Sequence, residues 1–142
     1  TTLHHIQTTK QLSMKQREIK FRAWDGEQMV SPDYIDRDGT AWWKENSIPT
    51  FNKEPMQFTG LPDKNGVEIY EGDICKISDP YDENEKVFMV EYKNGGFAVE
   101  WDSMFCGGEA DCTTIGWAID SEFTIEVIGN IYENENLLKC QD

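Results

Sequence analysis

Two closely spaced turn signals in the middle of the chain constrain its fold more than any other feature. They are Asp63-Lys64-Asn65-Gly66 and Glu71-Gly72-Asp73, both within the segment 56–76. Asn-Gly favours a β-turn because both residues tolerate positive φ, and Gly-Asp before β-branched residues is typical of a tight turn entering a strand. The apolar residues around these turns are Val67, Ile69, Ile74 and Ile77. The segment therefore predicts short strands joined by turns.

Short strands are predicted along most of the chain. Residues 18–24 alternate between Ile19, Phe21 and Ala23 on one face and polar or aromatic residues on the other, as a half-buried strand does. Further strands are predicted at 28–30, 56–59, 67–70, 73–77, 86–92, 97–101, 113–118 and 124–132. We expect a long loop region with short strands or a brief helical turn at 31–55, and a last helical turn at 133–138. The pattern predicts a mainly β fold: a small, strongly bent antiparallel sheet closing into a barrel, with long loops and at most short helical turns.

The length of 142 residues favours one domain. No apolar run approaches the roughly 20 residues that span a membrane, and no secretory leader is evident, so we expect a soluble intracellular protein with no membrane contact. Residues 1–13 differ from the rest because they are rich in Thr and Gln and contain no acid. We interpret them as an extension outside the domain, which then spans 14–142. The extension is an upstream start, a vector remnant, or an arm that becomes ordered only in an assembly. His4-His5 within it could suggest a metal site, but a frayed terminus is the better interpretation.

Acidic residues dominate the chain, whose formal net charge is −14. Residues 1–17 contain Lys10, Lys15 and Arg17 but no acid, so the remaining 10 basic and 27 acidic residues give 18–142 a charge of −17. Between Asn94 and Leu138 there is no Lys, Arg or His. Such a surface repels phosphate backbones, and we expect no direct nucleic-acid binding. It could attract basic proteins or cations, although solubility is the simplest interpretation.

No residue pattern predicts an enzyme, a cofactor site or a metal site. Cys106 and Cys112 are five residues apart, which is not a common zinc spacing, and we expect all four cysteines to be free thiols although a 106–112 disulfide is geometrically possible. The only histidines lie in the extension, and no phosphate-binding loop occurs. Asp63–Glu68 superficially resembles a calcium loop, but its Gly is fourth, so a structural turn is the better interpretation. The acidic run 79–85 reads as a solvated turn, and Asp73 is expected to accept backbone N–H bonds in its turn.

Aromatic and acidic side chains supply the candidate interaction residues. Most of the five tryptophans are expected in the core. Trp24, which is opposite in phase to Phe21, and the Trp42-Trp43 pair are the best candidates for exposed or interface aromatics. Glu109 and Asp111, in the loop 102–112, complete the predicted interaction surface.

Three sequence blocks resemble the YopX family of phage and prophage proteins. They are residues 17–25, residues 56–74, and residues 126–134 followed by Leu137-Leu138. They appear in the family's order and frame 14–138. Asn136 departs from the family, which usually has Pro there, and this puts the start of the last turn in question. The resemblance implies a natural start at Met14 and a core like an SH3-type barrel with additional elements, and it carries no established activity or catalytic residues.

The sequence and the resemblance together predict a phage or prophage accessory protein in the cytoplasm of a bacterial host. We expect a non-enzymatic interaction module that binds a protein partner or self-associates as a homo-oligomer. One alternative is an acidic nucleic-acid mimic that inhibits a host DNA-binding protein. The other is a hydrolase with a divalent metal held by carboxylates.

Overall fold

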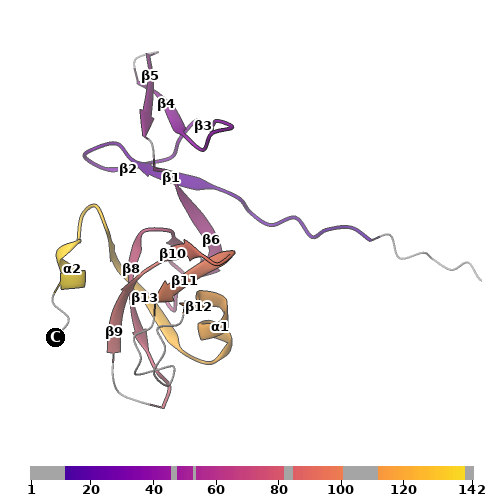
Figure 1. Cartoon of the computed structure of the whole chain (residues 1–142), viewed down its shortest axis with the longest axis vertical. Helices are drawn as coiled ribbons and strands as arrows, with labels where there is room; N and C mark the ends of the chain where they lie inside the picture. Colours follow the sequence, from indigo (N-terminus) through magenta and orange to yellow (C-terminus); the bar gives the residue numbers. More distant parts are fainter. Residues whose placement is uncertain (1–11, 46–47, 53, 82–84, 101–111, 140–142) are drawn as a thin grey trace, which may run out of the picture.

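The computed structural model describes residues 12–45, 48–52, 54–81, 85–100 and 112–139, and these form a mainly β structure (Figure 1). The strands of the first half are β1 Phe21–Trp24, β2 Met29–Val30, β3 Tyr34–Ile35, β4 Ala41–Glu45, β5 Ile48–Asn52, β6 Met56–Pro62 and β7 Glu68–Tyr70. Those of the second half are β8 Asp73–Ser78, β9 Glu85–Met89, β10 Glu91–Lys93, β11 Gly96–Glu100, β12 Cys112–Thr114 and β13 Thr124–Asn130. Two short helices are α1 Ile115–Asp120 and α2 Asn136–Lys139.

Strand β8 is the centre of the core. It pairs antiparallel with β13 on one side and β9 on the other, and Cys75 lies opposite Val127 and Phe88. The side chain of Cys75 is a free thiol with no solvent exposure. It belongs to a buried core that consists of Ile69, Cys75, Ile77, Val90, Val99, Ile115, Ala118 and Ile125. The strands predicted at 73–77, 86–92 and 97–101 are present, but the second is divided into β9 and β10, and β11 lies in a separate sheet with β10 and β12.

A second sheet has the order β2-β1-β6-β7; the Asp63–Gly66 turn joins β6 to β7, and the Glu71–Asp73 turn leads from β7 into β8. Phe21 of β1 pairs with Gln57 of β6, and the pairing of β6 with β7 is irregular between Phe58 and Pro62. Gly60 lies in this irregularity with a φ of +86°. A residue with positive φ bends the strand, so β6 changes direction at Gly60 before it enters the Asp63 turn.

The region 31–55 is more regular than predicted. It contains the antiparallel sheet β3-β4-β5, in which Trp42 pairs with Tyr34 and Phe51, so the predicted short strands are present but join in a sheet rather than interrupt a long loop. Asp36 organises the β3–β4 turn because its carboxylate accepts the N–H groups of Asp38 and Thr40, each at 2.9 Å. Figure 1 shows this sheet at the opposite end of the molecule from β9 and β13.

Residues 113–118, predicted as a strand, are strand only up to Thr114 and helix from Ile115. The Thr114 hydroxyl accepts the N–H of Trp117 at 3.3 Å, which caps the first turn of α1. The helix buries Ile115 and Ala118, which are three residues apart and thus share one helix face. At the C-terminus the predicted helical turn is present as α2, beginning at Asn136 rather than at Glu133.

The described strands form a half-barrel of open antiparallel sheets. The mainly β prediction is confirmed, whereas closure into an SH3-like barrel is not. Within the described ranges, none of the helices has the length and apolar character needed to cross a membrane. The division into an extension at 1–13 and a domain at 14–142 stays a prediction.

Candidate interaction site

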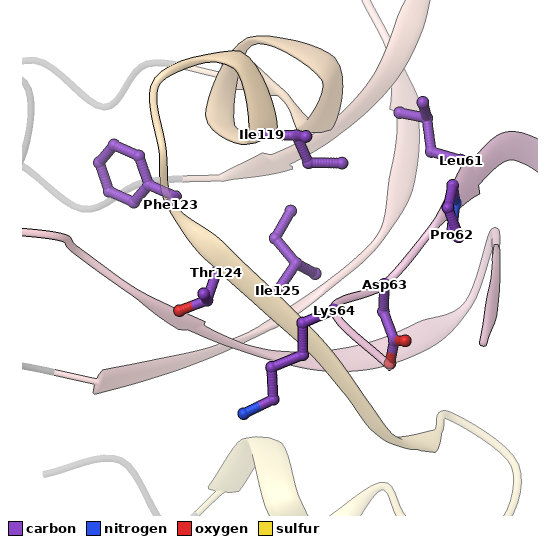
Figure 2. Close-up of a pocket in the computed structure, with 8 residues that line it drawn as sticks. All are labelled: Leu61, Pro62, Asp63, Lys64, Ile119, Phe123, Thr124 and Ile125. Carbon is purple, nitrogen blue, oxygen red and sulfur yellow. The ribbon is translucent and has the colours of Figure 1, made fainter. Parts of the chain in front are cut away.

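An open apolar hollow lies between the end of β6, helix α1 and the start of β13; we call it the α1 groove (Figure 2). Its volume is about 270 Å³, and it is lined by Leu61, Pro62, Asp63, Lys64, Ile119, Phe123, Thr124 and Ile125. Figure 2 shows Ile119 of α1 and Ile125 of β13 directed into the same space, whereas the polar ends of Lys64 and Asp63 point away from it. Leu61, Ile119 and Phe123 also pack against the buried core, so the groove is continuous with it.

Asp63 fixes one wall of the groove. One carboxylate oxygen accepts the N–H groups of Asn65 and Val67, and the other accepts the N–H of Val127 in β13 at 2.9 Å. The backbone N–H of Lys64 also donates to the Ile125 carbonyl at 2.9 Å. Burial acts to raise the pKa of Asp63, but the three N–H donors outweigh it and hold the pKa below its usual value. These contacts explain the calcium-like pattern, since the carboxylate binds backbone donors and thereby anchors the turn to β13.

The rim of the groove combines an exposed aromatic side chain with acids. Trp117 of α1 is 54% exposed, and its ring lies 5.8 Å from that of Phe123. Asp120 and Glu122, on either side of the helix C-terminus, are both exposed. Lys64 on the facing wall pairs with Glu126 at 3.2 Å. The exposed surface that α1 contributes is therefore aromatic and negatively charged.

A second, smaller hollow of about 220 Å³ lies beside the Glu71-Gly72-Asp73 turn. Glutamates 54, 71 and 91 and tyrosines 92 and 132 are among the residues that line it. The Tyr132 hydroxyl donates to Glu54 at 3.1 Å, and the Tyr132 ring stacks on Trp24 with centroids 5.4 Å apart. Glu71 accepts the backbone N–H of Gln57 at 3.0 Å. Part of this acidic lining is thus engaged within the chain.

Asp73, next to Gly72 in the lining of this hollow, forms a buried ion pair with Arg22. An Arg22 Nη2 atom lies 2.6 Å from Asp73 Oδ1, and the other carboxylate oxygen accepts the Tyr70 N–H at 2.7 Å. The guanidinium also lies 4.6 Å from the centroid of the Tyr70 ring. Burial raises the pKa of Asp73, and the charge of Arg22 opposes this rise. The predicted backbone bond to Asp73 is confirmed, and the arginine partner is an addition that sequence reasoning missed.

The structure distributes the predicted interaction residues over different sheets. Trp24 is half-buried against Tyr132. Trp42 is half-buried, donates from Nε1 to Asp36 at 2.9 Å, and stacks on the Tyr34 ring, whereas Trp43 is half-buried on the same strand. Glu109 and Asp111 lie outside the described residues. Trp24 and the Trp42-Trp43 pair thus lie in different sheets, and the role of all five residues in binding stays a prediction.

Trp117 is exposed, although sequence reasoning expected most of the tryptophans in the core and did not name Trp117 among the candidates for exposure. A signal was available, because Ile115, Ala118 and Ile119 recur at spacings of three and four after a capping threonine. Interpreted as a helix, this pattern puts Trp117 away from the apolar face. In the strand interpretation the same residue points inward, and that error hid the groove.

Comparison with known proteins finds relatives that match most of the chain. Residues 20–139 match the family described as YopX protein. The SPbeta prophage-derived uncharacterized protein YopX of Bacillus subtilis strain 168 is 30% identical over 135 residues, which cover 84% of this chain and 95% of that protein. The crystal structure of protein yopX from Bacillus subtilis matches with a TM-score of 0.60 at 29% identity, over 84% of this chain and 97% of that one. Protein EF1440 from Enterococcus faecalis matches with a TM-score of 0.53 at 28% identity, over 87% and 99%.

Proposed function

The chain belongs to the YopX family, and from this premise we propose that it is a phage or prophage accessory protein. In this proposal it acts in the cytoplasm of a bacterial host as a non-enzymatic interaction module. The prophage origin of the Bacillus subtilis relative supports the first part of the proposal. The module acts through the α1 groove, which accepts an apolar anchor from a protein partner.

The observation that carries this proposal is an exposed tryptophan beside an open apolar groove. Trp117, Phe123 and Ile119 present aromatic and aliphatic surface next to a hollow that is continuous with the core. Interfaces concentrate their binding energy in such aromatic anchors and apolar pockets, surrounded by a polar rim. The volume of about 270 Å³ is just below the roughly 300–1,000 Å³ of small-molecule pockets. It suits one or two side chains of a protein better than a whole cofactor.

The charge around the groove favours a basic partner. Asp120 and Glu122 flank the exposed face of α1, and the chain as a whole carries a formal charge of −14. Complementary charge speeds encounter and rejects acidic competitors, while the apolar anchor supplies most of the affinity. We therefore assign the groove a segment that combines apolar side chains with Lys or Arg.

A binding assay with a matched pair of variants tests the module. The tagged full chain is used to capture partners from host lysate, and each partner identified by mass spectrometry is then titrated by calorimetry. Trp117→Ala should weaken binding about tenfold or more, the range of an aromatic hot spot. Tyr81→Ala should leave the affinity unchanged, since Tyr81 is 89% exposed on the β8–β9 connection rather than in the groove lining.

Two results would contradict the proposal. The first is a partner that binds wild type and Trp117→Ala equally well, when Trp117→Ala and Tyr81→Ala have the same denaturation midpoint as wild type. The second is a chain that stays monomeric at high micromolar concentration and captures no partner.

A further inference from the structure

The segment before β1 is an exposed arm that combines apolar and basic side chains. Residues 12–19 form no helix or strand, and each of them is exposed. Leu12 and Met14 are 97% and 96% exposed, which is unusual for large apolar side chains. Figure 1 shows the segment running away from the sheet into open space. An extended segment with unpaired backbone and bare apolar side chains is suited to bind in trans.

The bend in β6 explains why the arm leaves its own chain. Antiparallel pairing of β1 with β6 continues as far as Lys20, whose carbonyl accepts the Phe58 N–H at 2.9 Å. One residue after Thr59, Gly60 has a φ of +86° and the pairing of β6 becomes irregular. A straight continuation of β1 therefore loses its neighbour there, and residues 12–19 separate from the strand that leads to the groove.

The arm and the α1 groove are complementary in chemistry. In an extended chain Leu12 and Met14 lie on one face, about 7 Å apart, and Lys15 and Arg17 lie on the other. The groove presents Ile119 and Ile125 to apolar side chains. Exposed acids 120 and 122 lie beside it, within a span of the sequence, 94–138, that has no basic residue. Long basic side chains reach across a rim of this kind while their neighbours fill the hollow.

We propose that the arm of one copy of this chain binds in the α1 groove of a second copy, with Leu12 and Met14 in the hollow and Lys15 and Arg17 beside Asp120 and Glu122. The inference rests on the proposed function, because it names the occupant of the same groove. Two copies related by a two-fold axis exchange arms reciprocally, which satisfies both grooves. The charge of the arm, basic and without acid up to Arg17, offsets the repulsion between two acidic bodies.

A charge-swap experiment on the full chain tests the contact. The dimer dissociation constant is measured by size-exclusion chromatography with light scattering and by analytical ultracentrifugation, for wild type, for Lys15→Glu/Arg17→Glu and for Asp120→Lys/Glu122→Lys. Each double variant should dissociate at about tenfold higher concentration or more, because like charges then face each other. A one-to-one mixture of the two variants, and the quadruple variant, should both recover wild-type association.

The apolar half of the contact has its own variant and control. Leu12→Ser/Met14→Ser should weaken association at least as much as the charge reversals, while Ser13→Ala, at an exposed position of the same arm, should leave it unchanged. A monomeric wild type, an association that the arm variants do not alter, or a mixture that does not recover association would each overturn the inference. A monomer in which Leu12 is protected from solvent would show that the arm binds its own groove instead, and this too overturns it.

The failure of this inference and that of the proposed function give different results. If the groove binds another protein, Trp117→Ala loses that partner and the arm variants keep it. If the groove binds nothing, neither set of variants changes any association. If both Trp117→Ala and Leu12→Ser/Met14→Ser lose self-association, the result supports both the proposed function and the arm contact.

Discussion

Asp63 and Asp73 lie in two turns of one segment and are both buried, yet their pKa values shift in opposite directions. Asp63 is held by three backbone N–H groups, and its pKa is lowered although burial acts to raise it. Asp73 has one backbone N–H and the guanidinium of Arg22, and burial raises its pKa in spite of that charge. Burial alone therefore does not decide the behaviour of a buried carboxylate; the number and kind of donors do.

The two aspartates also join different parts of the molecule. Asp63 ties the β6–β7 turn to β13 and so shapes the α1 groove, and the three donors that hold its carboxylate are backbone N–H groups. Asp73 ties β8 to β1, and that link depends on one side chain, 51 residues away. A contact made by backbone donors survives most substitutions, whereas a contact made by one arginine is lost with it.

The largest effect is expected from Arg22→Met. The variant leaves the Asp73 carboxylate buried without its counter-charge, and breaking a buried pair in this way costs about 3–5 kcal/mol of unfolding free energy. Urea denaturation followed by tryptophan fluorescence measures the loss. Lys64→Met is the control, because its pair with Glu126 is partly exposed and should cost no more than about 1 kcal/mol. A loss below about 1 kcal/mol in Arg22→Met would mean that the pair does not hold β1 to β8.

Asp63→Ala should lower the unfolding free energy by less than Arg22→Met does, about 2–3 kcal/mol. The substitution leaves buried N–H donors without an acceptor, each with a penalty of about 1–3 kcal/mol, and water entering the opened turn recovers part of it. Amide hydrogen exchange should become faster at Val127, whose N–H donates to Asp63, and stay unchanged at Lys76 in the middle of β8. Asp63→Asn retains one acceptor oxygen, so its exchange rate at Val127 should lie between those of Asp63→Ala and wild type. Equal exchange at Val127 in all three proteins would contradict the role assigned to Asp63.

The glycines of the two turns give a matched pair. Gly66 and Gly72 have φ values of +83° and +80°, so an alanine at either position adopts a conformation that costs about 1–2 kcal/mol. A Cβ at Gly72 would also lie 2.9 Å from the Met56 sulfur, whereas one at Gly66 meets nothing within 4 Å. Gly72→Ala should therefore lower the denaturation midpoint more than Gly66→Ala does. The reverse order would show that Met56 moves aside at no cost and that the Asp63 turn is the less tolerant one.

The pH dependence of stability should differ in sign between the two carboxylates, with a slope below about 1.4 kcal/mol per pH unit for each. The folded pKa of Asp63 lies below the unfolded value of about 3.9, so its contribution is complete above that value and lost as the pH falls through the folded pKa. The folded pKa of Asp73 is raised, so its contribution is complete below about pH 3.9 and lost as the pH rises through the folded pKa.

Denaturation curves between pH 3 and pH 6 separate these contributions. On acidification, Asp63→Asn should lose less stability than wild type, because the wild-type carboxylate must be protonated against its N–H donors. Asp73→Asn should lose more than wild type, because it lacks the gain that protonation of a buried carboxylate brings. Parallel curves for all three proteins would remove the distinction between the two sites.

Local turn chemistry made much of the fold predictable. Asn65-Gly66 and Gly72-Asp73 demand particular backbone angles within a few residues, and the strands β6, β7 and β8 begin and end near the predicted positions. The region 113–118 failed because Thr-Thr-Ile-Gly-Trp has β propensity on every residue but the glycine. The cap from Thr114 is a local signal for the helix, whereas the burial of Ala118, which also favours it, acts only once the core is assembled.

The candidate site was less predictable because its contacts are distant in sequence. Asp63 reaches Val127 across 64 residues, and the α1 groove joins β6, α1 and β13. Periodicity describes which face of one element is buried, but it does not say which other element covers that face. Trp24, which the sequence favoured as exposed, stacks on Tyr132, 108 residues away, and Trp42 contacts Asp36 and Tyr34 across the β3–β4 turn.

The position of Cys75 makes its thiol a built-in probe of how often the core opens. Its side chain is fully buried in the strand that joins both halves of the core sheet, and burial raises the pKa of the thiol to about 12. A thiol reagent needs a thiolate with access to solvent, so Cys75 reacts only while β8 is separated from β13 or β9. Alkylation of the Cys75 peptide, followed over time by mass spectrometry, therefore counts the openings of the core at neutral pH without denaturant.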